Sequence, residues 1–190
     1  MSLTLLAGKL FLPRQIKLER HLTGAAALQR EVLRRLLNRA ANTQYGRAHL
    51  FSTTHTYEDF ARNVPINTYE ELKADIDRMR HGEADVLWPG VVKWYAKSSG
   101  TTNDKSKFIP VSAEGLKHIH YQGGTDVVAL YLKNNPKSRM FDGKGLILGG
   151  SHSPNYNLSG SLVGDLSAIL IENINPLVNL VRTPKKQTAL

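Results

Sequence analysis

The sequence predicts an α/β protein whose N-terminal half is α-helical. Residues 1–90 contain segments with the apolar spacing or the capping pattern of helices, whereas residues 91–190 alternate short apolar segments with longer helical patterns. Strands that alternate with helices are typical of α/β folds. The length of 190 residues suits one domain, or one domain with an arm.

Three helices are expected in the first half. Residues 24–41 place apolar side chains at spacings of three to five between arginines, which predicts an amphipathic helix capped by Thr23. The segments 56–59 and 68–71 each place a threonine three residues before an acidic residue, the pattern of a capping box. They predict a short helix that ends before Val64 and a longer one that ends near Gly82.

In the second half, strands are expected to alternate with helices. Residues 92–96 form an apolar and aromatic segment typical of a strand, and residues 108–111 a second, short extended segment. A helix from 113 to about 133, kinked near its two glycines, precedes a buried strand over 145–150. The polar stretch 151–161 predicts a loop, and residues 162–171 predict a helix.

The most informative segment lies between the two predicted strands and is rich in hydroxyl side chains and lysines (97–110). In a turn after a strand, successive backbone N–H groups form an anion site to which hydroxyls add donors and a lysine adds charge. The segment contains neither G-x-x-x-x-G-K-[ST] nor G-x-G-x-x-G, which excludes the two commonest nucleotide-binding loops. On composition alone, an ordinary polar loop is the more frequent interpretation.

The order of the residues resembles the phosphate-binding signature of acyl-adenylate-forming enzymes, S-[ST]-G-[ST]-[ST]-x-x-x-x-K. Its positions are matched by Ser98, Ser99, Gly100, Thr101, Thr102 and Lys107. With the flanking segments 42–46, 64–66, 82–89 and 164–167, the chain resembles the Gretchen Hagen, or auxin-responsive promoter, family of acyl-acid amido synthetases, and its bacterial members in particular. Asp104 is a departure, because many adenylate-forming enzymes carry glycine near this point and a carboxylate repels a polyphosphate.

The resemblance implies an ATP-dependent ligase that joins a carboxylic acid to an amino acid, with Mg²⁺ as the metal. The six matched residues would bind the phosphates, and no nucleophilic side chain is required. Residues 1–190 would be the N-terminal part of the large domain, mainly helical over 1–90 and strand–loop–helix over 91–190. The C-terminal domain and the metal ligands would lie beyond Leu190, so that the chain alone is expected to be inactive.

Charge leaves a second function open. Most of the net charge of +9 comes from the first fifty residues, which contain nine Lys or Arg and two Glu. A basic helix favours contact with an acidic partner, so the alternative is a non-catalytic anion-binding or interaction domain. No nucleic-acid motif accompanies the basic helix, and no segment has the length and apolar character of a membrane span.

The remaining features predict a cytoplasmic protein with no metal site of its own. The chain has no cysteine, and Lys9 interrupts the apolar N-terminal segment, which argues against a signal peptide. His118 and His120 lie two apart, so on a helix they cannot face one ion. Trp94 and Tyr95 are expected in the core. His152 is expected in a solvated loop, with the wall of a substrate cleft as the weaker alternative.

Overall fold

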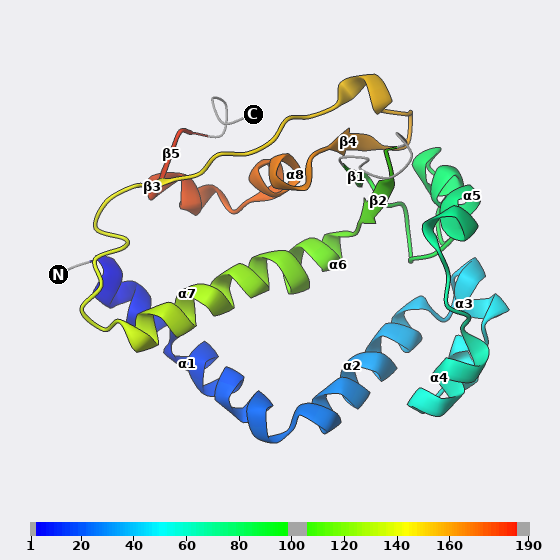
Figure 1. Cartoon of the computed structure of the whole chain (residues 1–190), viewed down its shortest axis with the longest axis horizontal. Helices are drawn as coiled ribbons and strands as arrows, with labels where there is room; N and C mark the ends of the chain where they lie inside the picture. The colour runs from blue at the N-terminus through cyan, green and yellow to red at the C-terminus, as the bar shows by residue number, and fades with distance from the viewer. Residues whose placement is uncertain (1–2, 99–105, 186–190) are drawn as a thin grey trace. The chain divides into compact units, whose positions relative to one another are not determined.

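A computed structural model describes residues 3–98 and 106–185 and divides into two compact units (Figure 1). Unit 1 comprises Met1–Thr23, Ala113–His152 and Asp165–Leu190, and unit 2 comprises Gly24–Ser112 and Ser153–Gly164. The model contains helices and a mixed sheet, which confirms the α/β class. Among the residues it describes, no helix combines the length and the apolar character needed to cross a membrane.

Unit 1 is built around two long helices, α1 and α7, which pack against each other. Its elements are α1 (Leu3–Thr23), α6 (Ala113–Gly115), the π-helical segment η2 (Leu116–Tyr121), α7 (Gln122–Asn134), β3 (Gly145–Leu146), α8 (Leu166–Asn173), the short helix η4 (Pro176–Leu180) and β5 (Arg182–Thr183). The helical run after Ala113 is thus irregular before the glycines rather than at them. A π-helical turn of this kind accommodates an extra residue within a helix.

Polar contacts fix α1 on α7. The Arg14 guanidinium binds the Asp126 carboxylate through two hydrogen bonds, and Gln15 donates to the carbonyl of Ala129 at 2.8 Å. The bonds from Arg14, and then the bond from Gln122, lower the pKa of Asp126. These partners are far apart in the sequence, so the sequence alone gives Asp126 no partner.

Asp126→Asn is expected to destabilise unit 1 at pH 7 by about 1–2 kcal/mol, because it removes a charged partner of the half-buried Arg14. Since the pKa of Asp126 is lower in the folded state, its contribution is present above the unfolded pKa and is lost as the pH falls through the folded pKa. Urea unfolding followed by circular dichroism at pH 7 and in acid measures both effects. Glu19→Gln, which breaks the exposed pair between α1 and Lys133, is the control and should cost less than about 0.5 kcal/mol. Equal losses for the two variants would contradict the prediction.

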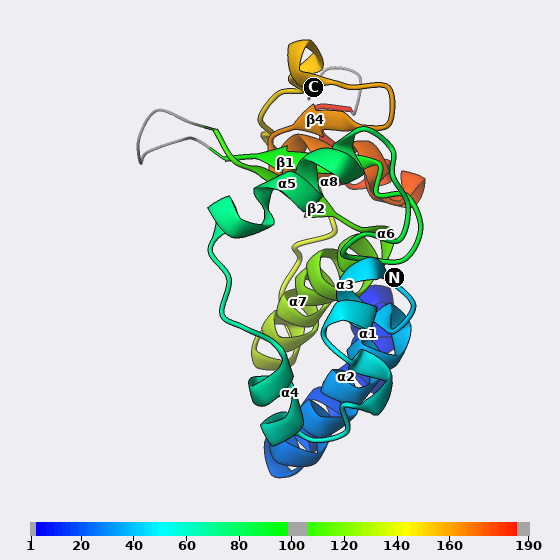
Figure 2. The ribbon, with the colours of Figure 1, turned by 90° about the vertical axis from the view of Figure 1, so that its right-hand side faces the viewer.

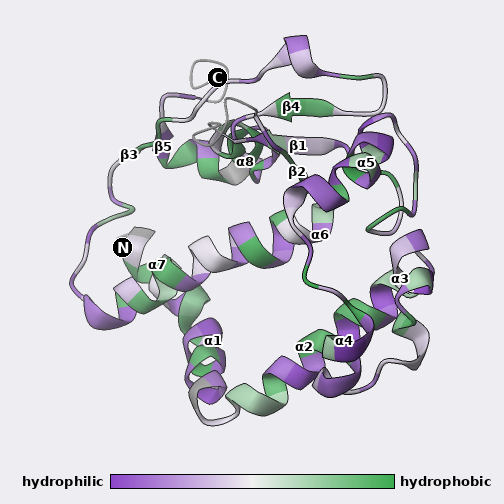
Figure 3. Cartoon of the chain, turned by 45° about the vertical axis from the view of Figure 1, so that its right-hand side comes forward, coloured by the Kyte–Doolittle hydropathy of each residue, from purple (hydrophilic) through white to green (hydrophobic). Residues whose placement is uncertain are grey.

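Unit 2 begins with helices, three of which match the helices expected from the sequence. They are α2 (Ala25–Ala40), α3 (Gln44–Ala48), the 3-10 turn η1 (Phe51–Thr53), α4 (Tyr57–Asn63) and α5 (Tyr69–Arg80). Hydrophilic and hydrophobic residues alternate along α2, as its amphipathic pattern predicts (Figure 3). The capping box of Thr56 and Asp59 is formed, and the Glu71 carboxylate accepts a bond from the Thr68 N–H at 2.6 Å. The cap predicted at Thr23 is wrong, because Thr23 ends α1 and Gly24 precedes α2 without a side-chain cap.

A three-stranded sheet completes unit 2. It consists of β1 (Trp94–Lys97), β2 (Phe108–Val111) and β4 (Leu162–Gly164) in the order β2-β1-β4. β1 is antiparallel to β2, with Lys97 opposite Phe108, and parallel to β4, with Trp94 opposite Leu162. The helix predicted over 162–171 is therefore wrong in its first part, where the chain forms a strand before α8.

The strand predicted over 145–150 is shorter in the structure and is not buried. Only Gly145 and Leu146 pair, in parallel with β5, and both are exposed. Leu148 is 77% exposed. An apolar run alone does not bury a strand, since burial needs a face of another element packed on it.

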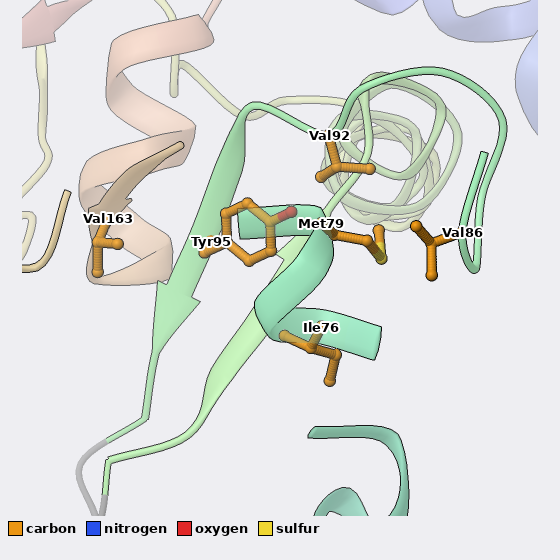
Figure 4. Close-up of a cluster of buried hydrophobic side chains, with 6 residues drawn as sticks. All are labelled: Ile76, Met79, Val86, Val92, Tyr95 and Val163. Atoms are coloured by element: carbon orange, nitrogen blue, oxygen red, sulfur yellow. The ribbon is translucent and has the colours of Figure 1, made fainter. Parts of the chain in front are cut away.

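One hydrophobic core cluster of unit 2 lies between α5 and the sheet (Figure 4). It contains Ile76, Met79, Val86, Val92, Tyr95 and Val163. Tyr95 is fully buried, which confirms its core assignment, while Trp94 is partly buried. Burial raises the pKa of the Tyr95 phenol to about 12. This core fixes α5 against the two strands that border the hydroxyl-rich segment.

The segment 42–46 is held by backbone bonds on both sides. Thr43 caps α3 through its hydroxyl, which accepts from Gly46 N at 2.9 Å and donates to Ala40 O at 2.8 Å. A β-carbon on Gly46 would lie 2.1 Å from the Ala40 oxygen, so only glycine fits there. The segment therefore has a structural role in joining α2 to α3.

Candidate functional site

The hydroxyl-rich segment is the connection of a β-hairpin. β1 and β2 run side by side toward it (Figure 2). At the hairpin neck, Ser98 N donates to Lys107 O at 2.9 Å and Lys107 N donates to Ser98 Oγ at 3.1 Å. The first and last residues of the predicted phosphate site thus lie opposite each other. Ser99, Gly100, Thr101, Thr102 and Asp104 lie outside the described residues.

The ammonium group of Lys107 lies over an aromatic ring. Its Nζ is 5.4 Å from the centroid of the Tyr69 ring, at the start of α5. Among residues 3–98 and 106–185, no carboxylate forms an ion pair with Lys107. Its positive charge is therefore not neutralised within this part of the chain.

An open pocket of about 370 Å³ lies beside the hairpin neck. It is lined by Tyr69, Lys73, Asp77, Arg80, Ser106, Phe108 and Tyr156. Two cations and one carboxylate contribute to its wall, and two more lysines, Lys97 and Lys107, contact its aromatic rings. The side chains around the neck therefore carry an excess of positive charge.

Arg80 is the most deeply buried cation of this pocket, with 9% of its surface exposed. One terminal nitrogen donates to the carbonyl of Tyr156 at 2.9 Å, and the guanidinium lies 3.8 Å from the centroid of the Phe108 ring. The nearest oxygen of Asp77 is 3.5 Å away, a long contact. This ion pair is long for a hydrogen bond, and the Asp77 side chain is 44% exposed, so water screens part of its attraction to Arg80.

The three aromatic rings of the pocket each have a cation at one face. Arg80 lies against Phe108, Lys97 lies 4.1 Å from the Tyr156 centroid, and Lys107 lies against Tyr69. The Phe108 and Tyr156 rings are 5.8 Å apart. Ring faces attract cations electrostatically, so the cluster holds positive side chains in place without neutralising them.

In charge and in the type of hydrogen-bond donor, the residues around the hairpin neck suit a polyphosphate ligand. Ser98 offers a hydroxyl, Lys107 offers a cation without a carboxylate partner in the described chain, and the adjoining pocket is rich in further cations. Charged donors of this kind bind phosphate oxygens strongly.

The sequence predicts a phosphate-binding loop here but does not predict most of the residues that surround its neck. It placed Ser98 and Lys107, whereas Lys73, Arg80 and Tyr156 were not recognised as neighbours of the loop. Tyr156 follows Lys107 by almost fifty positions, and no local pattern connects the two. The order of residues in α5 contained one usable signal, since Tyr69, Lys73 and Arg80 recur at helical spacings of about one and two turns.

The histidines add no further site. His152 Nε2 lies 3.9 Å from Glu172 Oε2 within unit 1, and both side chains are about one-third exposed. His118 and His120 lie in the π-helical segment η2. Within the ranges 3–98 and 106–185, no three histidine or acidic side chains group as metal ligands do.

Comparison with known proteins places the chain in a family. The model of the GH3 family N-terminal domain matches residues 14–189. The indole-3-acetic acid-amido synthetase GH3.15 of Arabidopsis thaliana is 35% identical over 96 residues, which cover 50% of this chain and 16% of that protein. The probable indole-3-acetic acid-amido synthetase GH3.7 of Oryza sativa subsp. japonica is 34% identical over 99 residues, or 48% of this chain and 16% of that protein.

The fold is also found in a solved structure. The GH3.15 acyl acid amido synthetase matches with a TM-score of 0.74 and 24% identity over 91% of this chain and 30% of the solved chain. The present chain thus matches less than one-third of the length of these relatives. Because the family model matches nearly the whole chain, from Arg14 to Ala189, the chain belongs to the GH3 family.

Proposed function

We propose that this chain supplies the triphosphate-binding hairpin of an ATP-dependent acyl-acid amido synthetase. The observation that carries the proposal is the hairpin neck, where Ser98 and Lys107 face each other at the two ends of the signature and the nearby charge is positive. Family membership supports amide synthesis as the class of reaction. The substrates we propose are a carboxylic acid, an amino acid and ATP with Mg²⁺.

In this reaction a carboxylate oxygen attacks the α-phosphorus of ATP, the bond to the bridging oxygen breaks, and pyrophosphate leaves. The amine of the amino acid then attacks the activated carbonyl, and AMP leaves as the amide forms. The task of the hairpin is to bind the β and γ phosphates as negative charge grows on the leaving group. Lys107 would contribute its charge, and Ser98 and the other matched hydroxyls would contribute hydrogen bonds.

The residues that bind adenine, the metal ligands and the amine site are proposed to belong to other parts of the protein. The 190-residue chain is accordingly proposed to bind the phosphates without completing the reaction. A chain without cysteine fits the cytoplasmic location that we propose, where ATP and amino acids are available.

Replacing Lys107 by methionine is expected to weaken the binding of magnesium pyrophosphate by roughly 10- to 100-fold, because one charged donor is lost. Isothermal titration calorimetry on the 190-residue chain at fixed salt measures the affinity. Lys93→Met is the matched control, because Lys93 is exposed shortly before β1, and it should change the affinity less than about twofold. Failure of the unmodified chain to bind pyrophosphate would contradict the phosphate-binding role.

The exposed basic face of α2 favours one alternative, an interaction domain without catalysis. Arg30, Arg34 and Arg35 are all exposed on this helix. This alternative predicts that acidic vesicles or duplex DNA bind with a steep dependence on salt, and that the substitution of Lys107 leaves this binding unchanged. The same calorimetric series, run with these two probes, separates the two functions.

A further inference from the structure

We propose that Tyr69 is a positioning residue that fixes both the end of the phosphate-binding hairpin and the ammonium group of Lys107. The inference rests on the proposed function, since it concerns how the same hairpin holds its cation. Tyr69 does not belong to the phosphate-binding signature. Tyr69 lies on α5, which precedes the hairpin in the sequence, and contacts the hairpin from there.

The first contact is with the backbone. The Phe108 N–H donates to the Tyr69 hydroxyl at 3.0 Å. β2 is an edge strand, and at the neck Ser98 pairs with Lys107, so the N–H of the next residue points away from β1. The phenol therefore binds a group that the sheet leaves unpaired.

The second contact is with the side chain of the preceding residue. The Lys107 Nζ lies 5.4 Å from the centre of the Tyr69 ring, within the range of a cation–π interaction. One tyrosine thus holds two successive residues, one through its backbone and one through its charge. A lysine side chain loses much rotational freedom when it binds an anion, and a preferred position over the ring reduces that loss.

The position of Tyr69 is itself fixed. It is the first residue of α5, directly after Thr68, whose N–H and hydroxyl both bind the Glu71 carboxylate, at 2.6 Å and 2.7 Å. Its ring also packs on the buried cluster that contains Ile76 and Met79. A rigid helix start therefore sets where the hydroxyl and the ring face meet the hairpin.

The other cations near the neck are held by different rings. Arg80 lies on Phe108 and Lys97 lies on Tyr156. Within the described chain, Tyr69 is the ring that lies under the cation of the signature. Substituting Tyr69 should therefore affect Lys107 and leave Arg80 and Lys97 in place.

The test uses the 190-residue chain and magnesium pyrophosphate as the probe, with affinity measured by calorimetry. Tyr69→Phe keeps the ring and loses the hydrogen-bond acceptor, and should weaken binding roughly 2- to 5-fold. Tyr69→Leu loses both contacts and should weaken binding about tenfold. Tyr57→Leu is the matched control, because Tyr57 also begins a helix after a capping threonine but is 67% exposed, and it should change binding less than about twofold.

A merely structural role is separated from positioning by two readouts. Tyr69→Leu should weaken pyrophosphate binding by a smaller factor in a Lys107→Met background than in the unmodified chain, less than half as large. The reason is that the two residues act together. The protons on Cε of Lys107 should show an upfield ring-current shift in NMR spectra that persists in Tyr69→Phe and disappears in Tyr69→Leu.

The possible failures point to different conclusions. Absence of pyrophosphate binding by the unmodified chain overturns the proposed function. Binding by the unmodified chain that is unchanged in Tyr69→Leu, or equally weakened in both backgrounds, overturns the positioning role alone. The urea midpoint from tryptophan fluorescence confirms that each variant is folded before it is titrated.

Discussion

Gly160→Ala is expected to lower the free energy of unfolding of unit 2 by about 3 kcal/mol, the upper end of the usual cost of overpacking. A β-carbon on Gly160 would lie 2.4 Å from both the Cα and the N of Gly82 and 2.8 Å from the carbonyl carbon of His81. Gly82 has φ of +92° and lies two residues after the end of α5, in a backbone conformation that few residues other than glycine adopt. All these atoms are backbone, and no side-chain rotamer can relieve the overlap.

Urea unfolding followed by tryptophan fluorescence measures this effect on unit 2 selectively, because both tryptophans, Trp88 and Trp94, lie in that unit. Gly123→Ala in α7 is the control, since a β-carbon there meets no atom within 4 Å. That substitution should leave the fluorescence midpoint unchanged and stabilise its helix by up to about 1 kcal/mol. A Gly160→Ala variant with the midpoint of the unmodified chain would show that the two turns can separate freely.

Met79→Ala is the second substitution with a large expected effect, a loss of about 2–5 kcal/mol in unit 2. Met79 is 1% exposed and lies among the core side chains between α5 and the sheet. Alanine removes most of these contacts and leaves a cavity. The fluorescence-detected urea midpoint should fall accordingly, and the slope should stay constant if the transition remains two-state.

Met79→Leu provides the matched control, because it keeps nearly the same volume and should cost less than about 1.5 kcal/mol. Pyrophosphate affinity should be retained in this variant, since the core supports the hairpin without touching its ligand. If Met79→Ala and Met79→Leu cost the same, cavity formation would not be the cause.

Local patterns predicted the helices of unit 2 well. The capping boxes at Thr56 and Thr68 depend on residues three positions apart, so both are fully encoded within one turn of the chain. Their helices α4 and α5 begin where those threonines predict. Thr23 failed as a cap because α1, held by its packing on α7, extends to that residue.

Longer-range pairing could not be predicted in this way. Residues 162–171 form one apolar stretch, and a short run of this kind suits a strand or a helix equally. Pairing of Val163 with Tyr95 makes the first three residues a strand, and Tyr95 lies far earlier in the chain. The same holds for the candidate site. The ordered signature predicts the loop, whereas Tyr69, Arg80 and Tyr156 come close to the hairpin neck only through the tertiary fold.

Because β1 pairs with β4, a strand much later in the sequence, the sheet of unit 2 can be completed only late in the synthesis of the chain. Unit 2 completes its sheet only when Leu162–Gly164 joins, yet residues 113–152, which belong to unit 1, are translated in between. In a nascent chain that has not reached Gly164, the edge of β1 that later pairs with β4 is unpaired. The core cluster then also lacks the Val163 side chain. Such an edge is open to pairing with other chains, so aggregation is expected to be easiest in the interval between the synthesis of the two strands.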